Sequence, residues 1–155
     1  ENIPSDRTYD LAFMFDVVEH LEDYRATLHE LSHRTRYLLI NIPLEHCLFD
    51  IIRNVLRSGE YFRHQRKVLG HIHRFNAFEA FRWLEGSFEV VQSHNWPYCE
   101  HLLKLGCNNG AVFSKSRQFE LLLSRSISKF LPSLAPLVIQ GSKFVLFRST
   151  SSQDV

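Results

Sequence analysis

The sequence predicts an α/β fold in which parallel strands alternate with helices. Residues 9–15 form a largely apolar run that ends abruptly in Asp16. This pattern is typical of a buried parallel strand, whose carboxyl end presents polar groups where open α/β sheets bind ligands. A second short apolar run covers residues 37–42. Between the two runs, apolar residues recur at spacings of three and four and predict a helix over residues 22–34. Together these segments predict a right-handed parallel crossover unit.

The rest of the chain continues this alternation. We expect Pro43 to stop the second strand, because proline cannot donate to a central ladder. A polar segment that carries aromatic residues is expected from residue 58 to Gly70. After Asn76, a good N-cap, a helix is expected to run to residue 85 and to stop at Gly86. The other expected elements are a helix at 48–56, a strand at 88–94, a helix at 116–130 and a strand at 143–148. This order fits an α/β sheet that ends in an antiparallel pair.

The composition bounds the domain count and the broad class. A length of 155 residues suits one domain, expected at residues 1–149 with a frayed, disordered tail at 150–155. Contents of 45% hydrophobic and 23% charged residues are ordinary for a globular protein. The formal charge of +1 offers no bulk attraction to nucleic acid. The thirteen Phe residues suggest aromatic packing or an apolar surface that awaits a partner.

The cysteines and the N-terminal residues favour a reduced, cytoplasmic protein. No Cys-x-x-Cys spacing occurs among Cys47, Cys99 and Cys107. We therefore expect free thiols and no zinc site. The first residues lack the basic region and apolar core of a signal peptide. No uncharged apolar run reaches about 18 residues, so no spanning helix is expected.

Four segments, in order, resemble class I S-adenosylmethionine-dependent methyltransferases. Residues 8–23 resemble the fourth strand and the following turn, because family members commonly carry a strand that ends in Asp-x-x-Glu-His-Leu, as residues 16–21 do here. Residues 37–43 are similar to the fifth strand. Residues 70–91 are similar to a Gly-His-x-x-x-Phe segment, a helix and the start of the sixth strand, and residues 143–148 resemble the antiparallel seventh strand. The resemblance implies a partial Rossmann-like sheet of parallel strands with a closing antiparallel strand, helices on its faces, and S-adenosylmethionine as cofactor.

The sequence also departs from this family. Members begin with a strand and an Asp/Glu-x-Gly-x-Gly turn, and their second strand ends in an acid that holds the ribose, but neither feature occurs here. We therefore expect the C-terminal half of such a domain, truncated or else degenerate, and inactive alone with weak affinity for the cofactor. In the family the first strand pairs with the fourth, so residues 9–15 are expected to form an open apolar edge that promotes self-association. Two alternatives stay open, a non-catalytic interaction domain that pairs through this edge and another doubly wound enzyme with the same strand-end site.

The resemblance assigns roles to residues at the end of the first strand. Phe15, Asp16 and Val17 are expected to border the cofactor, although Asp16 is also well placed to cap the following turn. His20 is the expected general base, because imidazole exchanges protons near neutral pH, and Glu19 is expected to assist it. Alternatively, Glu19 and His20 only support the loop.

The expected methyl acceptor is a small molecule, a lipid or a saccharide. Its expected contacts lie at the end of the second strand and on the loop before residue 76, namely Asn41, Pro43, His71, His73, Arg74 and Phe75. In a metal-binding subset of the family, the positions of Asp16, Glu19, His20 and either His71 or His73 hold a divalent ion. Most members with this motif need no metal, and none is predicted.

Three further features have an ordinary structural interpretation. The apolar helix around residues 119–131, with residues 134–139, is expected to pack on the sheet, with peripheral contact to a membrane or a lipid-linked acceptor as the alternative. The basic residues 63–67 are expected to be solvated. Trp83 and Trp96 are expected in the core or in an interface, and the remaining histidines on the surface.

Overall fold

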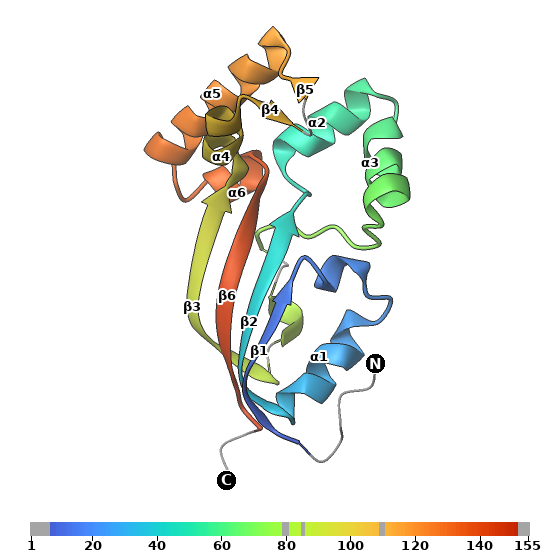
Figure 1. Cartoon of the computed structure of the whole chain (residues 1–155), viewed down its shortest axis with the longest axis vertical. Coiled ribbons are helices and arrows are strands. Elements are labelled where there is room, and N and C mark those ends of the chain that lie inside the picture. Colours follow the sequence, from blue (N-terminus) through green and yellow to red (C-terminus); the bar gives the residue numbers. More distant parts are fainter. Residues whose placement is uncertain (1–6, 79–80, 85, 109–110, 152–155) are drawn as a thin grey trace.

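The protein is built on a four-stranded mixed sheet. The computed structural model describes residues 7–78, 81–84, 86–108 and 111–151. The strand order is β1-β2-β6-β3, where β1 spans Tyr9–Phe15, β2 Thr35–Leu44, β3 Phe88–Pro97 and β6 Gly141–Ser149 (Figure 1). Strand β1 is parallel to β2, and β6 runs antiparallel to both β2 and β3. The predicted α/β sheet with parallel strands and a closing antiparallel strand is therefore confirmed.

The helices and the small hairpin fill the connections between these strands. They are η1 at Val18–His20, α1 at Tyr24–Ser32, α2 at Leu48–Leu56, α3 at Glu60–His64, the π-helical η2 at Gln65–Leu69, η3 at Arg82–Leu84, α4 at Tyr98–Leu105, β4 at Cys107–Asn108, β5 at Ala111–Val112, α5 at Lys115–Phe130 and α6 at Ala135–Val138. Side chains cap two of the helices, since Asp23 accepts from Ala26 N at the start of α1 and Ser114 accepts from Arg117 N at the start of α5.

The sequence expectations differ from these elements at three places. The segment expected to be polar and irregular up to Gly70 is mostly helical, as α3 and η2. The helix expected over 77–85 appears, in its described residues, as turns and η3, while residues 79, 80 and 85 lie outside the described part. Helix α4 and the β4–β5 hairpin were not predicted. The frayed tail expected at 150–155 stays a prediction, since residues 150 and 151 are described after β6 and the rest lie outside the described part.

Pro43 does not stop β2, contrary to the prediction. It is paired opposite Ser142 inside the ladder with β6. Asn41, two residues earlier, turns its carbonyl toward β1 and accepts from Asp16 N. Because backbone groups alternate in direction along a strand, Pro43 also turns its nitrogen to the β1 side, beyond the last residue of β1. The missing N–H therefore leaves no ladder bond unmade.

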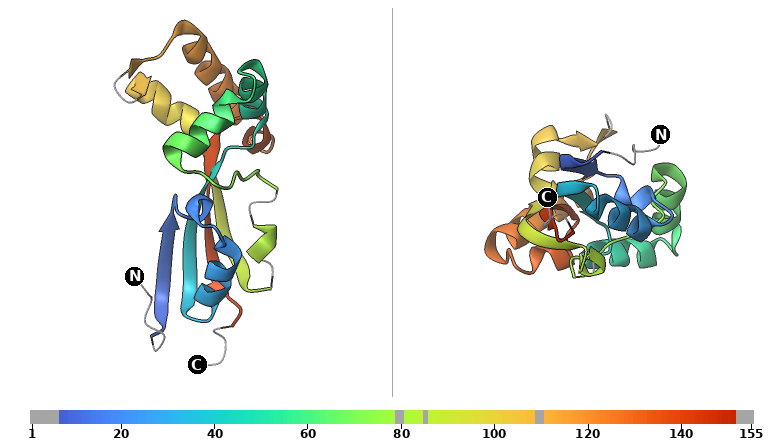
Figure 2. Two further views of the ribbon diagram at one scale, coloured as in Figure 1. Left: turned by 90° about the vertical axis from the view of Figure 1, so that its right-hand side faces the viewer. Right: turned by 90° about the horizontal axis from the view of Figure 1, so that it is seen from below.

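In the described part of the chain, helices cover one face of the sheet and leave the other open. Helix α1 and the segment with η3 lie over that face, where the main core forms around Met14, Leu38, Ile40, Val145 and Phe147 (Figure 2). On the opposite face, the alternate side chains of β1 are exposed, namely Leu11, Phe13 and Phe15. The outer edge of β1 pairs with no strand in the described part of the chain, as predicted.

The remaining helices form a cap at one end of the sheet. Helices α4, α5 and α6 enclose a second apolar cluster of Cys99, Leu121, Ala135 and Ile139 beyond the end of β3 (Figure 1). Trp96 is not a core residue, since it is 49% exposed and packs its ring on Phe144. The side chain of Trp83 lies outside the described part. Among the described residues, no helix combines the length and apolarity needed to cross a bilayer.

Candidate functional site

The carboxyl ends of β1 and β2 meet at one place. Phe15 is paired with Asn41 in the parallel ladder, and Asp16 N donates to the Asn41 carbonyl over 3.4 Å. The Asn41 amide Nδ2 also donates to Asp16 Oδ1 at 3.0 Å. Asp16 has a φ of 50°, in the left-handed region, so the chain turns sharply as it leaves the strand. Asp16 therefore links the two strand tips, and no side chain caps η1, which sets aside the capping alternative.

The short helix η1 places the Glu19 side chain inside the protein, where its carboxylate has no hydrogen-bond partner among the described residues. Glu19 is 1% exposed, and neither of its carboxylate oxygens makes a hydrogen bond to the described part of the chain. Burial raises the pKa of Glu19, and the nearby negative charge of Asp16 adds to this effect. The Glu19 carbonyl accepts from Ile72 N at 2.9 Å and from His73 N at 3.1 Å. These two bonds bring the loop of residues 70–75 against η1.

Two imidazoles meet beside this carboxylate. His20 Nδ1 lies 3.1 Å from the Gly70 carbonyl, and His71 Nδ1 lies 2.7 Å from Glu45 Oε2. The His20 and His71 rings contact each other edge to face at 4.9 Å. Because a carbonyl only accepts, His20 Nδ1 carries the proton, and Nε2 is the accepting nitrogen of the neutral ring. Gly70 has a φ of 76°, a conformation that favours glycine.

The other predicted loop residues hold the loop in place. His73 Nε2 lies 2.9 Å from the Leu21 carbonyl, and its ring packs on Tyr24. The Arg74 guanidinium lies over the Phe62 ring at 4.5 Å. Phe75 is buried in the main core, where packing accounts for its position. Of the six residues predicted to contact the methyl acceptor, Asn41 and His71 are therefore the ones that bond directly to carboxylates of the site, those of Asp16 and Glu45.

Glu45 is a site residue that the sequence analysis missed. It is 3% exposed, bonds His71, and accepts from Gln65 Nε2 at 3.3 Å. Burial raises its pKa, and the hydrogen bond from His71 lowers it. The signal was present, since Glu45 directly follows β2 just as Asp16 follows β1. An acid at the carboxyl end of each parallel strand is the pattern that open α/β sheets use for ligand sites.

Glu19, His20 and His71 also satisfy the geometry of a small ligand set. One ligand atom from each lies within 4.8 Å of the others. The Nδ1 atoms of both histidines face oxygen acceptors, which is the support that metal-bound imidazoles usually have. The unpartnered Glu19 carboxylate is an additional indication, because buried carboxylates normally have partners. These residues fit either a proton-transferring site or a divalent cation with oxygen and nitrogen ligands.

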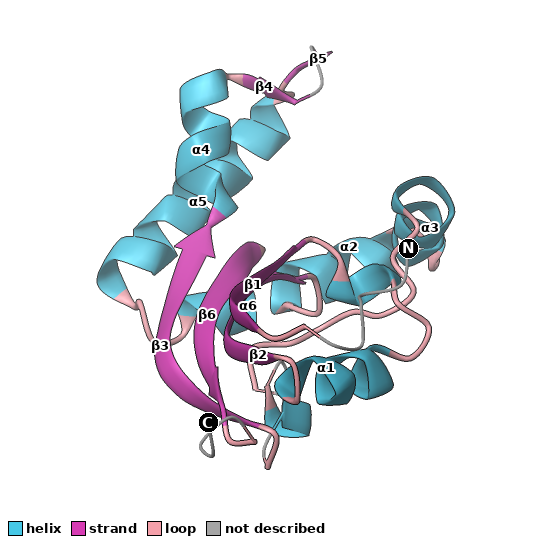
Figure 3. Cartoon of the chain, turned by 60° about the horizontal axis from the view of Figure 1, so that its bottom comes forward, coloured by secondary structure: helices cyan, strands magenta, loops and turns pink. Residues whose placement is uncertain are grey.

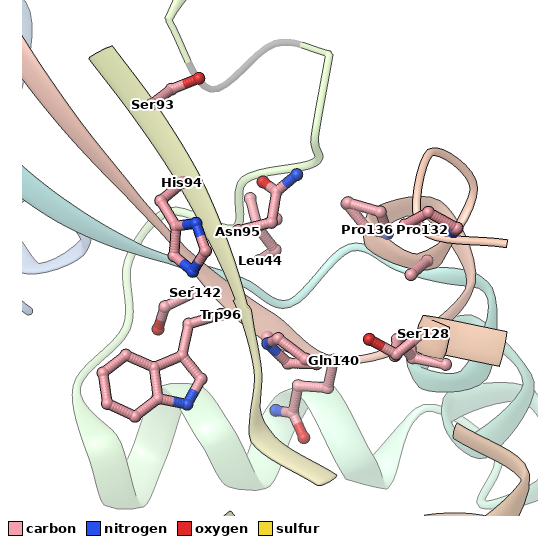
Figure 4. Close-up of a pocket in the computed structure, with 14 residues that line it drawn as sticks. Leu44, Ser93, His94, Asn95, Trp96, Ser128, Pro132, Pro136, Gln140 and Ser142 are labelled. Carbon is pink, nitrogen blue, oxygen red and sulfur yellow. The ribbon is translucent and has the colours of Figure 1, made fainter. Parts of the chain in front are cut away.

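A separate cavity of about 290 Å³ lies beside α6 and is lined by other residues. Leu44, Asn95, Pro136 and Gln140 are among the residues that line it, and none of the predicted site residues does. Figure 4 shows Asn95 and Pro136 on one side of β3, with His94 and Trp96 directed to the other side. Among the described residues, its lining includes His94 but no carboxylate and no Lys or Arg, so the combination of acids and imidazoles occurs at the strand tips and not in this cavity.

The chain belongs to the methyltransferase domain family. A family model described as a methyltransferase domain matches residues 1–93, which is more than half of the sequence. The strand tips, the parallel β1–β2 pair and the antiparallel β6 agree with the predicted C-terminal part of the class I fold.

Solved structures also match this chain. The fold is similar to that of a proposed sarcosine dimethylglycine methyltransferase from Galdieria sulphuraria, at 15% identity and a TM-score of 0.48. The match covers 94% of this chain and 55% of that chain, so this chain spans about half of that protein's length. No curated protein matches the sequence at a significant level.

Proposed function

We propose that this chain forms part of an S-adenosylmethionine-dependent methyltransferase site. This part lies at the carboxyl ends of β1 and β2, which correspond to the fourth and fifth strands of the family. The observation that carries this proposal is the convergence of Asp16, Glu19, His20, Asn41 and His71 at the carboxyl ends of β1 and β2. S-adenosylmethionine, when bound, supplies an electrophilic methyl group. The protein's part is then to align the acceptor, exclude water and remove a proton.

The residues divide into two groups in this proposal. Phe15, Asp16 and Val17 at the tip of β1 border the cofactor, with Asp16 fixed by its bond from Asn41. His20 acts as the general base through Nε2, because its Nδ1 donates to Gly70. Glu19 beside it favours a positively charged imidazole once the proton has moved.

The acceptor-facing residues are those of β2 and the following loop. Asn41, Pro43 and His71 lie nearest to the strand tips, and His71 is oriented by Glu45. His73, Arg74 and Phe75 support the same loop through Leu21, Phe62 and the core. The acceptor class in this proposal is a small molecule, a lipid or a saccharide that carries a proton on its nucleophilic atom.

We expect the chain to bind S-adenosylhomocysteine weakly, with a Kd of about 1 mM or higher, because the sequence has no Gly-x-Gly turn to approach the methionine part of the ligand. A titration followed by ¹H–¹⁵N NMR should move the signals of residues 15–20, 41–45 and 70–73. Asp16→Ala should reduce these shifts, and Asp10→Ala, an exposed acid on the same strand, should leave them unchanged.

Two results would contradict this expectation. Micromolar or tighter binding by calorimetry would show that the Gly-rich turn is dispensable. Shifts confined to the opposite end of the sheet, around Tyr9 and Ser149, would remove the strand tips as the ligand site.

A divalent cation is the alternative occupant of this site, with His20 as a ligand in place of its role as base, because the Glu19 carboxylate has no hydrogen-bond partner among the described residues and lies beside two histidines. Mg²⁺ or Mn²⁺ suits this donor set, and bound to it would orient an acceptor oxygen. We expect Mn²⁺ to raise the Tm of the wild type and to leave that of His71→Gln unchanged. His94→Gln is the matched control, since His94 is exposed and lies on β3. An equal Tm response in all three proteins would exclude cation binding at this cluster.

A second candidate function is a non-catalytic interaction domain that pairs through β1. The unpaired outer edge of β1 and the exposed ring of Phe13 favour it, because open apolar edges recruit further strands. We expect dimers or larger species in light scattering, which Phe13→Lys should convert to monomer. Phe130→Lys replaces an even more exposed ring on α5 and should leave the oligomeric state unchanged. A monodisperse wild-type monomer at high concentration would end this candidate.

A further inference from the structure

Helix α2 is oriented with its polar side toward the protein and its apolar side outward. Asp50 is its buried residue, with no exposed surface. The outward side carries five exposed aliphatic residues, which we name the α2 apolar stripe: Leu48, Ile51, Ile52, Val55 and Leu56. Val55 is 70% and Leu56 is 79% exposed. A helix on a globular protein normally turns such a stripe toward the core.

Polar contacts hold α2 in this orientation. Arg53 bonds both Asp50 and Glu120 of α5, and Tyr61 of α3 donates to Asp50 at 2.9 Å. Asn54 Oδ1 accepts from Phe62 N at 3.0 Å. Rotating the helix to bury its stripe would break all of these contacts. The outward direction of the stripe is therefore a built feature of the cap.

Basic residues accompany the stripe. Residues 48–69 contain five Lys and Arg against two acids, and one of these acids is the buried Asp50. The exposed cations follow α2 directly and define a basic rim: Arg57, Arg63, Arg66 and Lys67. Val68 and Leu69 beside them are exposed and apolar. Helices α2 and α3 lie next to each other (Figure 3), and the rim residues belong to α3 and to the segments directly before and after it.

We propose that the α2 apolar stripe and the basic rim bind the surface of an anionic lipid bilayer. An interfacial helix inserts aliphatic side chains between lipid headgroups, while Arg and Lys beside it attract anionic lipid. The surface has both parts, and its charge selects an anionic bilayer over a neutral apolar partner. This inference is independent of methyl transfer, because it uses no residue of the strand-tip site.

Vesicle sedimentation tests the proposal with the wild-type chain. We expect binding to vesicles of phosphatidylcholine mixed with phosphatidylglycerol, and at least tenfold weaker binding to phosphatidylcholine alone. Binding should weaken as salt is added. Val55→Ser/Leu56→Ser and, separately, Arg66→Glu/Lys67→Glu should each lower the partition coefficient at least tenfold. All four positions are exposed, so these variants should fold, which circular dichroism checks.

The matched control is Phe130→Ser/Leu131→Ser, which removes two exposed apolar side chains from the end of α5. It should bind vesicles as the wild type does. Loss of binding in this control alone would move the membrane contact to α5 and overturn the assignment to α2. Equal binding to neutral and anionic vesicles would also overturn it. Self-association that disappears in Val55→Ser/Leu56→Ser, with no vesicle binding, would identify a second copy as the occupant instead.

Discussion

Arg53→Ala is expected to lower the free energy of unfolding by about 3–5 kcal/mol, which is the usual cost of removing one partner of a buried ion pair. Arg53 bonds Asp50, which is fully buried, and Glu120, which joins α2 to α5. Its Nη1 also donates to the Tyr61 hydroxyl at 3.3 Å. Alanine would leave the Asp50 carboxylate without a countercharge in the interior.

The loss of unfolding free energy in Arg53→Ala should be larger at neutral pH than in acid. Burial raises the pKa of Asp50, and the charge of Arg53 is the main influence that lowers it. Without Arg53 the pKa of Asp50 rises further. An acid with a raised folded pKa destabilises the folded state as pH rises from its unfolded value to its folded value. The cost of Arg53→Ala should therefore be largest near neutral pH and smaller in acid, as measured by urea unfolding at both.

Arg63→Ala is the matched control for Arg53→Ala. Arg63 pairs with Glu60 three residues earlier, but this pair is exposed, with side chains 69% and 61% accessible. Exposed pairs contribute at most about 1 kcal/mol, so this variant should unfold at nearly the wild-type denaturant concentration. Similar losses in the two arginine variants would show that the buried network does not stabilise the cap.

The same network shows what the sequence pattern leaves open. The aliphatic spacing in residues 48–56 predicted α2 with its observed bounds and grouped Leu48, Ile51 and Val55 on one side. The spacing does not say which side faces the protein. That choice depends on Glu120 and Tyr61, which lie outside the helix and supply the partners for Asp50 and Arg53.

The strands were predicted well where local apolar runs define them. Strand β1 has the predicted bounds, because polar residues flank a run that must be buried on one face. The predicted end of β2 was wrong. The missing N–H of Pro43 costs a ladder hydrogen bond only where a neighbouring strand reaches it, and β1 ends before that point. Helix α4 was missed, since its helical state depends on packing against α5 around Cys99 and Leu121.

The candidate site followed from a strand-end rule and from the family resemblance. Asp16 was found because it ends an apolar run, Glu19 and His20 because residues 16–21 resemble the family's Asp-x-x-Glu-His-Leu motif, and His71 because it lies in a His-rich loop. Glu45 follows the next strand and meets the same rule, yet its importance appears only when the loop brings His71 to it. Proximity across 26 residues of sequence is a property of the fold.

Glu19→Gln is expected to raise the free energy of unfolding at neutral pH by about 1–2 kcal/mol in the presence of a chelator. The wild-type carboxylate is buried without a hydrogen bond, and its pKa lies above the ordinary value of 4.5. The wild-type protein is therefore most stable below the ordinary pKa of Glu19, and it loses stability as pH rises from that value toward the raised pKa of the folded state. Gln has a similar shape and no charge, so the two proteins should be equally stable in acid and diverge as pH increases. Urea unfolding across this range measures the difference.

Glu22→Gln separates this effect from a general loss of negative charge. Glu22 is exposed and lies three residues after Glu19, so its replacement should leave the pH dependence unchanged. If Glu19→Gln instead lowers stability in the presence of a chelator, the carboxylate has a favourable partner in the protein. The interpretation of Glu19 as a buried charge without a partner is then wrong. When Mn²⁺ replaces the chelator, a bound cation would compensate the charge of Glu19, so the wild type should gain stability that Glu19→Gln does not. The order of the two proteins then reverses, because the carboxylate that destabilises the free site is the group that holds the ion.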